Sequence, residues 1–307
     1  MKMNETVDGV AERVHSLLKS GKGKEQIVRF NQLVARVESK IPTLRGLRKK
    51  LHRRAGVHLY INASGAQNAT DGRGVRMSVR VHGCECGTVK VDSDKKRTFA
   101  PSNRCLFERY DYDKVRGLEW EDPAVARFIK ACVDAVDSNE VKTGRPEASV
   151  ESDLIFRMKS GSGGSWRLQQ PVCLAGMPLQ VPLPITASRP EPRLGDGHID
   201  VLARLGRGGK GLRVYEVKAP GARVEKVLNQ AVAYLVALKF LLTQDDAVAR
   251  RAWWKLLEFS KQPNHMPRLE AFAYVADNPE NRSRLAKACR KLAPANRENI
   301  FVDAMFY

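Results

Sequence analysis

Two short apolar segments on either side of a glycine-rich stretch constrain this chain most. Residues 198–205 and 212–218 are rich in β-branched and apolar residues, and the sequence GRGGKG lies between them. This pattern predicts two strands joined as a β-hairpin. Because side chains alternate along a strand, Glu216 and Lys218 are expected on one face, and the hairpin can bring Asp200 beside them.

Two carboxylates and an ammonium on one face of a sheet lose hydration and repel unless something compensates. A divalent cation does so, because Asp and Glu oxygens are hard ligands for Mg²⁺. The alternative is a set of ordinary charges on a solvated hairpin. The next segment, residues 223–242, has helical periodicity and places Gln230 and Tyr234 four residues apart on one face of an otherwise apolar helix.

These residues together resemble the PD-(D/E)XK nuclease superfamily. The family pattern is an acid at the end of one strand, (D/E)-x-K on the next and often a Gln on the following helix. Gln230-x-x-x-Tyr234 is similar to the Q-x-x-x-Y motif of the RecB and Cas4 branch. A further family element is a glutamate on the helix before the sheet, for which Glu151 is the better candidate and Glu147 the weaker, with Ser149 as the expected N-cap.

The resemblance implies a restriction-endonuclease-like α/β fold, a mixed sheet flanked by helices, that hydrolyses phosphodiester bonds with Mg²⁺ or Mn²⁺. Asp200, Glu216 and the Val217 carbonyl would hold the metal, and Glu151 could add a ligand. Lys218 would orient or deprotonate the attacking water. Gln230 and Tyr234 would support the site or position the nucleic-acid strand. The Fe–S cysteines of the Cas4 branch have no counterpart, so no cluster is expected.

The charge balance agrees with a polyanionic substrate. The chain has 53 Lys and Arg against 34 Asp and Glu, a formal net charge of +19, which attracts nucleic acid. Residues 45–54 are the most basic stretch and are either a backbone-binding helical face or a solvated helix end. The candidate nucleic-acid-binding residues there are Arg48, Lys49, Lys50, Arg53 and Arg54.

The N-terminus carries charges where a signal peptide needs an apolar stretch, and the longest apolar run is too short to span a bilayer. A cytoplasmic protein with reduced cysteines and no membrane partner is therefore expected. His82, Cys84, Cys86 and Cys105 allow a zinc site. Their spacing lacks the usual C-x-x-C, which favours buried free thiols instead.

Residues 1–140 are predicted to form an α+β domain of unknown role, and residues 147–307 the nuclease-like domain, with residues 136–148 as the boundary. In the first domain, helices are expected over 5–19, 24–54 and 122–137. Four strands are expected within 56–64, 73–83, 88–94 and 105–113. After residue 242, the pattern predicts a helix over 245–262 with Trp253 and Trp254 in the core or at an interface, a strand over 266–277, a helix over 279–293 and a final strand.

Three function classes stay open from the sequence. The preferred one is a metal-dependent DNA nuclease acting in defence, repair or DNA processing. The second is an RNA nuclease of the same fold, because phosphates are common to both substrates. The third is a non-catalytic module that binds nucleic acid or protein. A homo-oligomer, or a regulatory partner bound through the first domain, is also left open.

Overall fold

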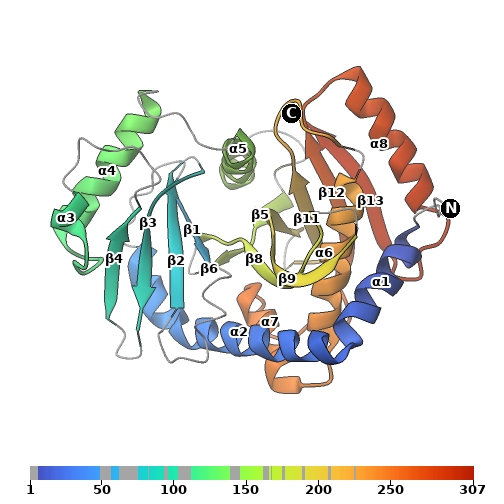
Figure 1. The fold of residues 1–307 in the computed structure, drawn as a ribbon, viewed down its shortest axis with the longest axis horizontal. Coiled ribbons are helices and arrows are strands. Elements are labelled where there is room, and N and C mark those ends of the chain that lie inside the picture. Colours follow the sequence, from blue (N-terminus) through green and yellow to red (C-terminus); the bar gives the residue numbers. More distant parts are fainter. Residues whose placement is uncertain are drawn as a thin grey trace.

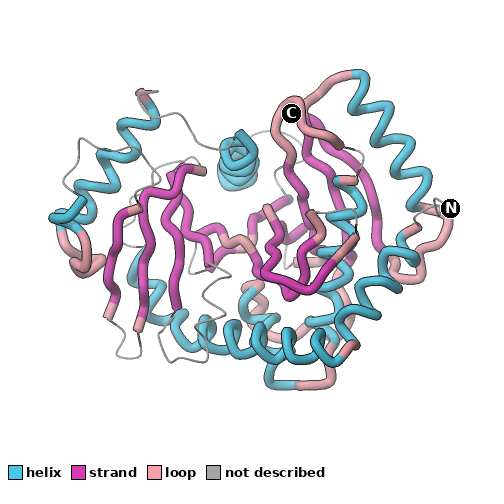
Figure 2. Tube along the Cα trace, in the orientation of Figure 1, coloured by secondary structure: helices cyan, strands magenta, loops and turns pink. Residues whose placement is uncertain are grey.

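The computed structural model describes most of the chain (Figures 1 and 2). Described are residues 6–48, 57–61, 75–81, 83–92, 96–102, 112–138, 146–161, 166, 168–174, 177–188, 191–206, 209–224 and 226–307. The helices are α1 (Val7–Lys19), α2 (Gly21–Arg48), α3 (Tyr112–Val115), α4 (Pro123–Asp137), α5 (Pro146–Ser160), α6 (Val227–Thr243), α7 (Ala247–Leu256) and α8 (Pro279–Leu292). The strands are β1 (Val57–Ile61), β2 (Val75–Val81), β3 (Cys84–Val91), β4 (Arg97–Pro101), β5 (Gln169–Pro171), β6 (Cys173–Leu174), β7 (Met177–Pro178), β8 (Val181–Thr186), β9 (Arg193–Ile199), β10 (Val201–Leu205), β11 (Gly211–Val217), β12 (Arg268–Val275) and β13 (Ile300–Phe306).

A mixed five-stranded sheet forms the centre of the C-terminal half. Its order is β13-β12-β11-β10-β5; β5, β10 and β11 pair antiparallel, and β11, β12 and β13 pair parallel. Parallel neighbours need a crossover connection, and α6 with α7 lies between β11 and β12 while α8 lies between β12 and β13. The predicted α/β class is therefore confirmed at the level of a mixed α/β fold.

The hairpin predicted from the sequence is present as β10 and β11. Val201 lies opposite Tyr215, and Leu205 lies opposite Gly211. The turn uses glycine where the backbone demands it, because Gly206 and Gly209 have φ values of 69° and 71°. The hairpin thus fixes which residues meet at its far end, where β11 finishes and β10 begins.

The two faces of this sheet are covered by different helices. On one face α5 packs against β11 and β12, through an apolar cluster that includes Leu154, Tyr215 and Tyr274. On the other face lies α6, which also contacts α1 and α7. Apolar residues are buried on nearly all sides of α6, as expected of a helix surrounded by protein. It begins at Val227, four residues later than the sequence pattern predicts.

The helix α7 confirms the expected core role of the tryptophans. Trp253 and Trp254 are buried, and their indole N–H groups donate to Asn31 Oδ1 at 2.8 Å and to the Leu242 carbonyl at 3.2 Å. The predicted strand, helix and strand that follow are present as β12, α8 and β13. In the described parts of the chain, no helix combines the length and apolar character that a membrane crossing needs.

A two-stranded ribbon of β8 and β9 leads directly into Asp200. Its register shifts between Leu183 and Ile185, in the segment whose prolines predict an edge or a break. The strands approach most closely at Gly197, where an added Cβ would lie 1.8 Å from the Ile185 carbonyl oxygen. Only glycine fits there, because the obstacle is backbone.

Gly197→Ala is therefore expected to lower the free energy of unfolding by about 3 kcal/mol, the upper end of the usual cost of overpacking. Gly195→Ala on the same strand is the control, because its Cβ would meet only the Thr186 methyl group, at 3.3 Å. Urea unfolding of both variants measures the difference. Equal losses in the two variants would contradict the close approach at Gly197.

The N-terminal half contains an antiparallel sheet in the order β1-β2-β3-β4. Phe128 and Cys132 of α4 belong to the buried cluster that contains Met77 and Val79 of β2. The expected helix over 122–137 is confirmed, with Asp122 as its N-cap. The sequence did not predict β4, which occupies Arg97–Pro101. Most of the predicted strand over 105–113 lies outside the described residues, and its last two residues belong to the short helix α3.

The first two helices pack on the C-terminal half. α1 lies against α6, and α2 runs along both halves and contacts α7, β8 and β2 (Figure 1). The Asp8 backbone N–H donates to the Ala295 carbonyl at 3.1 Å. Val14 of α1 and Leu235 of α6 share one buried apolar cluster. The boundary expected near residue 140 therefore does not separate α1 and α2 from the helices that cover the C-terminal sheet.

Candidate functional site

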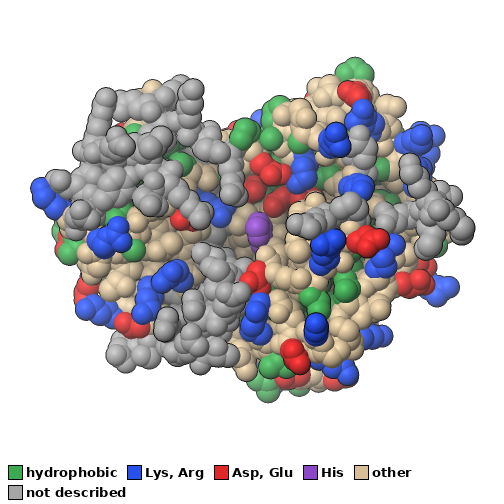
Figure 3. All heavy atoms as spheres, viewed as in Figure 1, with side chains coloured by type: hydrophobic (Ala, Val, Ile, Leu, Met, Phe, Trp, Pro, Cys, Tyr) green, Lys and Arg blue, Asp and Glu red, His purple; other side chains and the backbone are tan. Residues whose placement is uncertain are grey.

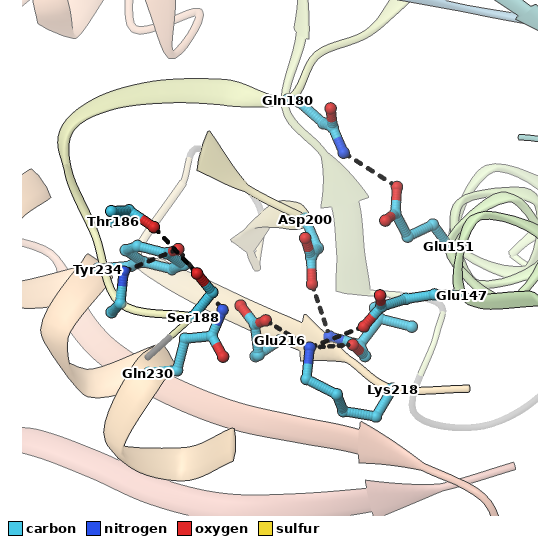
Figure 4. Close-up of polar contacts among 12 residues, drawn as sticks. Glu147, Glu151, Gln180, Thr186, Ser188, Asp200, Glu216, Lys218, Gln230 and Tyr234 are labelled. Atoms are coloured by element: carbon cyan, nitrogen blue, oxygen red, sulfur yellow. Dashed lines mark hydrogen bonds and ion pairs between the residues drawn. The ribbon is translucent and has the colours of Figure 1, made fainter. Parts of the chain in front are cut away.

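The ends of β10 and β11 bring three charged side chains together (Figure 4). Asp200 Oδ2 accepts a hydrogen bond from the Val217 backbone N–H at 2.9 Å. Lys218 Nζ donates to Glu216 Oε1 at 2.8 Å and to the Val217 carbonyl oxygen at 2.9 Å. The geometry follows the strand alternation predicted from the sequence, with Glu216 and Lys218 on one face and Asp200 beside them.

Helix α5 adds two glutamates to this group. Glu147 Oε1 lies 2.7 Å from Lys218 Nζ. Glu151, one turn further along the helix, is buried, and its Oε2 accepts a hydrogen bond from Gln180 Nε2 at 3.1 Å. The residue judged weaker from the sequence, Glu147, is thus the one that contacts the lysine. The expected N-cap was wrong, because α5 begins at Pro146 and Ser149 lies inside its first turn.

Burial makes these carboxylates hard to ionise. Burial is the largest cause that raises the pKa of Glu216, and the charge of Asp200 adds to it, while Lys218 opposes it. The pKa of Glu151 is raised by burial and then by Asp200, with Arg80 opposing. The pKa of Asp200 is also raised, mainly by burial. Four acidic side chains therefore surround one lysine, and those that are buried favour a bound proton or a second cation.

The lysine is held as an ammonium. Burial acts to lower the pKa of Lys218, but the charges of Glu216 and Asp200, and hydrogen bonds from its ammonium to Glu147 and Glu216, outweigh it and raise that pKa above its usual value. A protonated lysine donates hydrogen bonds and cannot accept a proton. In this arrangement Lys218 is a fixed positive charge with three acceptors, which are Glu147, Glu216 and Val217.

One oxygen in the site has no partner. Glu216 Oε2 is buried and accepts no hydrogen bond from any described residue. A buried carboxylate oxygen without a donor costs free energy, and either a proton shared with the neighbouring Asp200 carboxyl or a bound cation would satisfy it. Among the described residues, no three His, Cys, Asp or Glu side chains form a complete metal-ligand group. The oxygens that fit a hard cation are those of Asp200 and Glu216 with the Val217 carbonyl, two carboxylates and one backbone group.

Gln230 and Tyr234 lie on α6 beside this group, as their spacing predicts. Gln230 Nε2 lies 3.5 Å from the Tyr234 hydroxyl oxygen, which accepts a hydrogen bond from the Ala187 backbone N–H at 3.2 Å. Burial, and then the charge of Glu216, raises the pKa of the Tyr234 phenol. Tyr234 therefore fixes the backbone that follows β8 through this hydrogen bond. The Thr186 and Ser188 hydroxyl groups on either side of Ala187 are hydrogen-bonded to each other.

Two contacts of the site lack a signal in the sequence. Gln180, which fixes Glu151, lies in an apolar stretch of prolines and leucines that predicts only a buried edge. Tyr307 donates its hydroxyl hydrogen to the Lys218 carbonyl oxygen at 2.8 Å, which ties β13 to the end of β11. In each case the two partners are far apart in the sequence, so local periodicity cannot predict that they meet.

The surface around the site is mixed in charge. In Figure 3, Asp and Glu side chains gather near the middle of the face, beside a histidine. His198 is exposed next to Asp200, and its charge favours ionised Asp200, whose pKa burial raises more strongly. In the predicted basic stretch, α2 ends at Arg48, whose side chain is not among those described. Lys49, Lys50, Arg53 and Arg54 lie outside the described residues.

Of the four residues considered for a zinc site, the structure describes Cys84 and Cys86. Cys84 and Cys86 are buried on β3 as free thiols, and Cys86 Sγ donates to the Val79 carbonyl at 3.4 Å. His82 and Cys105 lie outside the described residues. The described part thus supports the reading as buried thiols for Cys84 and Cys86, whose side chains belong to the core that faces α4.

Comparison of the chain with family models, with curated proteins and with solved structures finds no match in any of the three.

Proposed function

We propose that this protein is a metal-dependent nuclease that hydrolyses phosphodiester bonds, with DNA as the favoured substrate. The observation that carries the proposal is the unpartnered, buried Oε2 of Glu216. It lies in a group that also contains Asp200 and Lys218. A structural ion pair requires one acid for one lysine, whereas this site gathers four acids and leaves an oxygen without a donor.

The order of elements supports the resemblance to the PD-(D/E)XK superfamily. Helix α5 carries Glu147 and Glu151, β10 begins just after Asp200, and β11 ends in Glu216-Val217-Lys218. The next helix, α6, carries Gln230 and Tyr234 before the parallel strand β12. A restriction-endonuclease-like fold, a mixed sheet flanked by helices, is the proposed reading of this arrangement.

The residues divide the chemical work by their charge. Asp200, Glu216 and the Val217 carbonyl would hold a Mg²⁺ or Mn²⁺ ion, which supplies positive charge to the attacked phosphate and lowers the pKa of water. Lys218, whose three N–H groups are donated to Glu147, Glu216 and Val217, would act as a fixed positive charge that stabilises the negative charge that develops during attack. Glu147 orients Lys218 through their 2.7 Å contact. Gln180 positions Glu151, and Tyr234 holds the neighbouring backbone.

The test is cleavage of supercoiled plasmid, linear duplex, single-stranded DNA and RNA, each with EDTA, Mg²⁺ or Mn²⁺. We expect cutting only with a metal ion, and the most rapid cutting with DNA. Thermal unfolding in the same buffers provides a second readout, because a ligand that binds only the folded state raises the melting temperature. Preferred cutting of RNA would move the assignment to an RNA nuclease of the same fold. No cutting and no metal-induced shift would favour the non-catalytic module.

A further inference from the structure

The outer face of the N-terminal sheet presents a row of polar side chains. On β2, Met77 and Val79 point into the core that faces α4, so the alternate residues Arg76 and Arg80 point the opposite way. We define the outer face as the described side chains on that side of the sheet. They are Arg76, Ser78 and Arg80 of β2, Glu85, Thr88 and Lys90 of β3, and Thr98 and Ala100 of β4, and of these Ser78 is buried.

Two cations lie directly opposite each other on the outer face. Arg76 and Lys90 are Cα partners across β2 and β3. Arg76 is exposed and Lys90 is half-buried, and neither forms an ion pair with a carboxylate in the part of the chain that the structure describes. Like charges in this position destabilise a sheet. By contrast, Arg80 lies opposite Glu85, so the far end of the face is balanced.

The outer face is fixed beside the candidate site. The turn after β2 packs tightly on α5, because a Cβ at Gly83 would lie 2.5 Å from Ala148. Ala148 follows Glu147, which contacts Lys218. Arg80 is close enough for its charge to oppose the rise in the pKa of Glu151. From Arg76 to Arg80 the strand rises about 13 Å, or about four nucleotide steps of a duplex. Figure 3 shows Lys and Arg side chains over β2–β4, on the face that carries the central acidic group.

We propose that the outer face binds the sugar–phosphate backbone of the nucleic acid at a distance from the bond that is cut, with Arg76 and Lys90 as the main phosphate contacts. This inference rests on the proposed nuclease function. Cations and hydroxyls, here those of the half-buried Thr88 and Thr98, are the groups that contact phosphates. A protein partner would require apolar anchors, and a membrane would require an apolar face for insertion. Ala100 is the largest apolar side chain among the described residues of the face.

The test is binding of a fluorescent 30-base-pair duplex in EDTA, where no metal-dependent cutting occurs, as a function of salt. The variant is Arg76→Thr with Lys90→Thr, since threonine is suited to a strand. The control is Lys287→Gln with Arg290→Gln, which removes one lysine and one arginine from the exposed side of α8. We expect the variant alone to weaken binding about tenfold and to reduce the slope of log Kd against log salt by about 2, one unit for each phosphate that the protein no longer neutralises.

Two further readouts separate the outer face from the site. Cleavage of bis(p-nitrophenyl) phosphate, which is too small to reach β2, is expected to be unchanged in the variant. Its melting temperature is expected to be equal to or above that of the wild type, because a like-charge pair is removed. A salt slope equal to that of the wild type, or an equal reduction in the control, would overturn the inference, as would a wild-type protein that binds no duplex. A reduced slope in a protein that cuts nothing would retain the outer face and reject the nuclease.

Discussion

Glu216→Gln is expected to lower metal-dependent cleavage by at least about 10²–10³-fold, the size found when a single preorganised electrostatic group is removed. Glutamine keeps the shape of the side chain and can still accept a hydrogen bond from Lys218. It removes the negative charge from Oε1 and Oε2, the second of which is buried without a partner. Because burial raises the pKa of Glu216, the variant loses a charge that is costly to bury, so it is expected to fold.

The matched control for this prediction is Glu270→Gln. Glu270 is also a buried glutamate of the same sheet, on β12, where it pairs with Arg213 and accepts from Arg268 Nε at 2.8 Å. Its removal from an ion pair is expected to reduce stability while cleavage below the melting temperature is retained. The two variants are compared by plasmid nicking with Mg²⁺ and by urea unfolding. Full activity of Glu216→Gln would remove the basis of the proposed function.

Lys218→Met is expected to reduce turnover by about 10²–10³-fold, while nucleic-acid binding changes much less, because the ammonium acts on charge that develops during the reaction. Methionine preserves much of the length of the side chain. Lys239→Met is the control, since Lys239 forms a comparable pair with Glu298 at 2.7 Å outside the site. Single-turnover cleavage and binding in EDTA measure the two quantities. Equal losses in both would make Lys218 a simple phosphate anchor.

The same change has a large effect on stability that depends on pH. Without Lys218 the buried carboxylate of Glu216 loses its nearest cation, which costs about 3–5 kcal/mol at neutral pH. The folded-state pKa of Glu216 is raised, so the folded protein binds its proton more tightly than the unfolded chain does. The contribution of the Glu216 proton to the free energy of unfolding is therefore complete below about pH 4.3, and it decreases as the pH rises towards the folded-state pKa. Urea unfolding of the variant in EDTA at pH 4 and pH 7.5 tests this sign.

The parts of the site that depend on local periodicity follow from the sequence. Strand alternation predicts the meeting of Asp200, Glu216 and Lys218, and helical spacing predicts the pairing of Gln230 with Tyr234. The positions of the side chains on α5 are harder to predict from periodicity. A helix that starts at Pro146 instead of Ser149 changes which glutamate is nearest to Lys218, and no periodic signal fixes the first residue of a helix to that accuracy.

The fold, like the site, is predicted where it depends on local periodicity and is not predicted where it depends on contacts between distant segments. The order of strands and helices after Asp200 is predicted correctly, because most of these elements have a clear period, whereas the strand β9 before it was not predicted. The strand β4 was missed because its five residues end in proline and offer little alternation. The packing of α1 on α6 is a contact between segments more than 200 residues apart. The composition of residues 1–140 does not indicate whether α1 packs on α6 or within a separate N-terminal domain.

The contact between α1 and α6 limits when the protein can complete its folding during synthesis. During synthesis α1 emerges before α6, the helix that buries its apolar face, which follows more than 200 residues later. At about 5–20 residues per second, that face stays without its partner for about 10–40 s. A fragment that starts at residue 147 would leave the apolar surface of α6 uncovered and prone to aggregation. The smallest unit for expression must therefore include α1, and a fusion that restrains α1 would delay assembly of the sheet that carries Glu216.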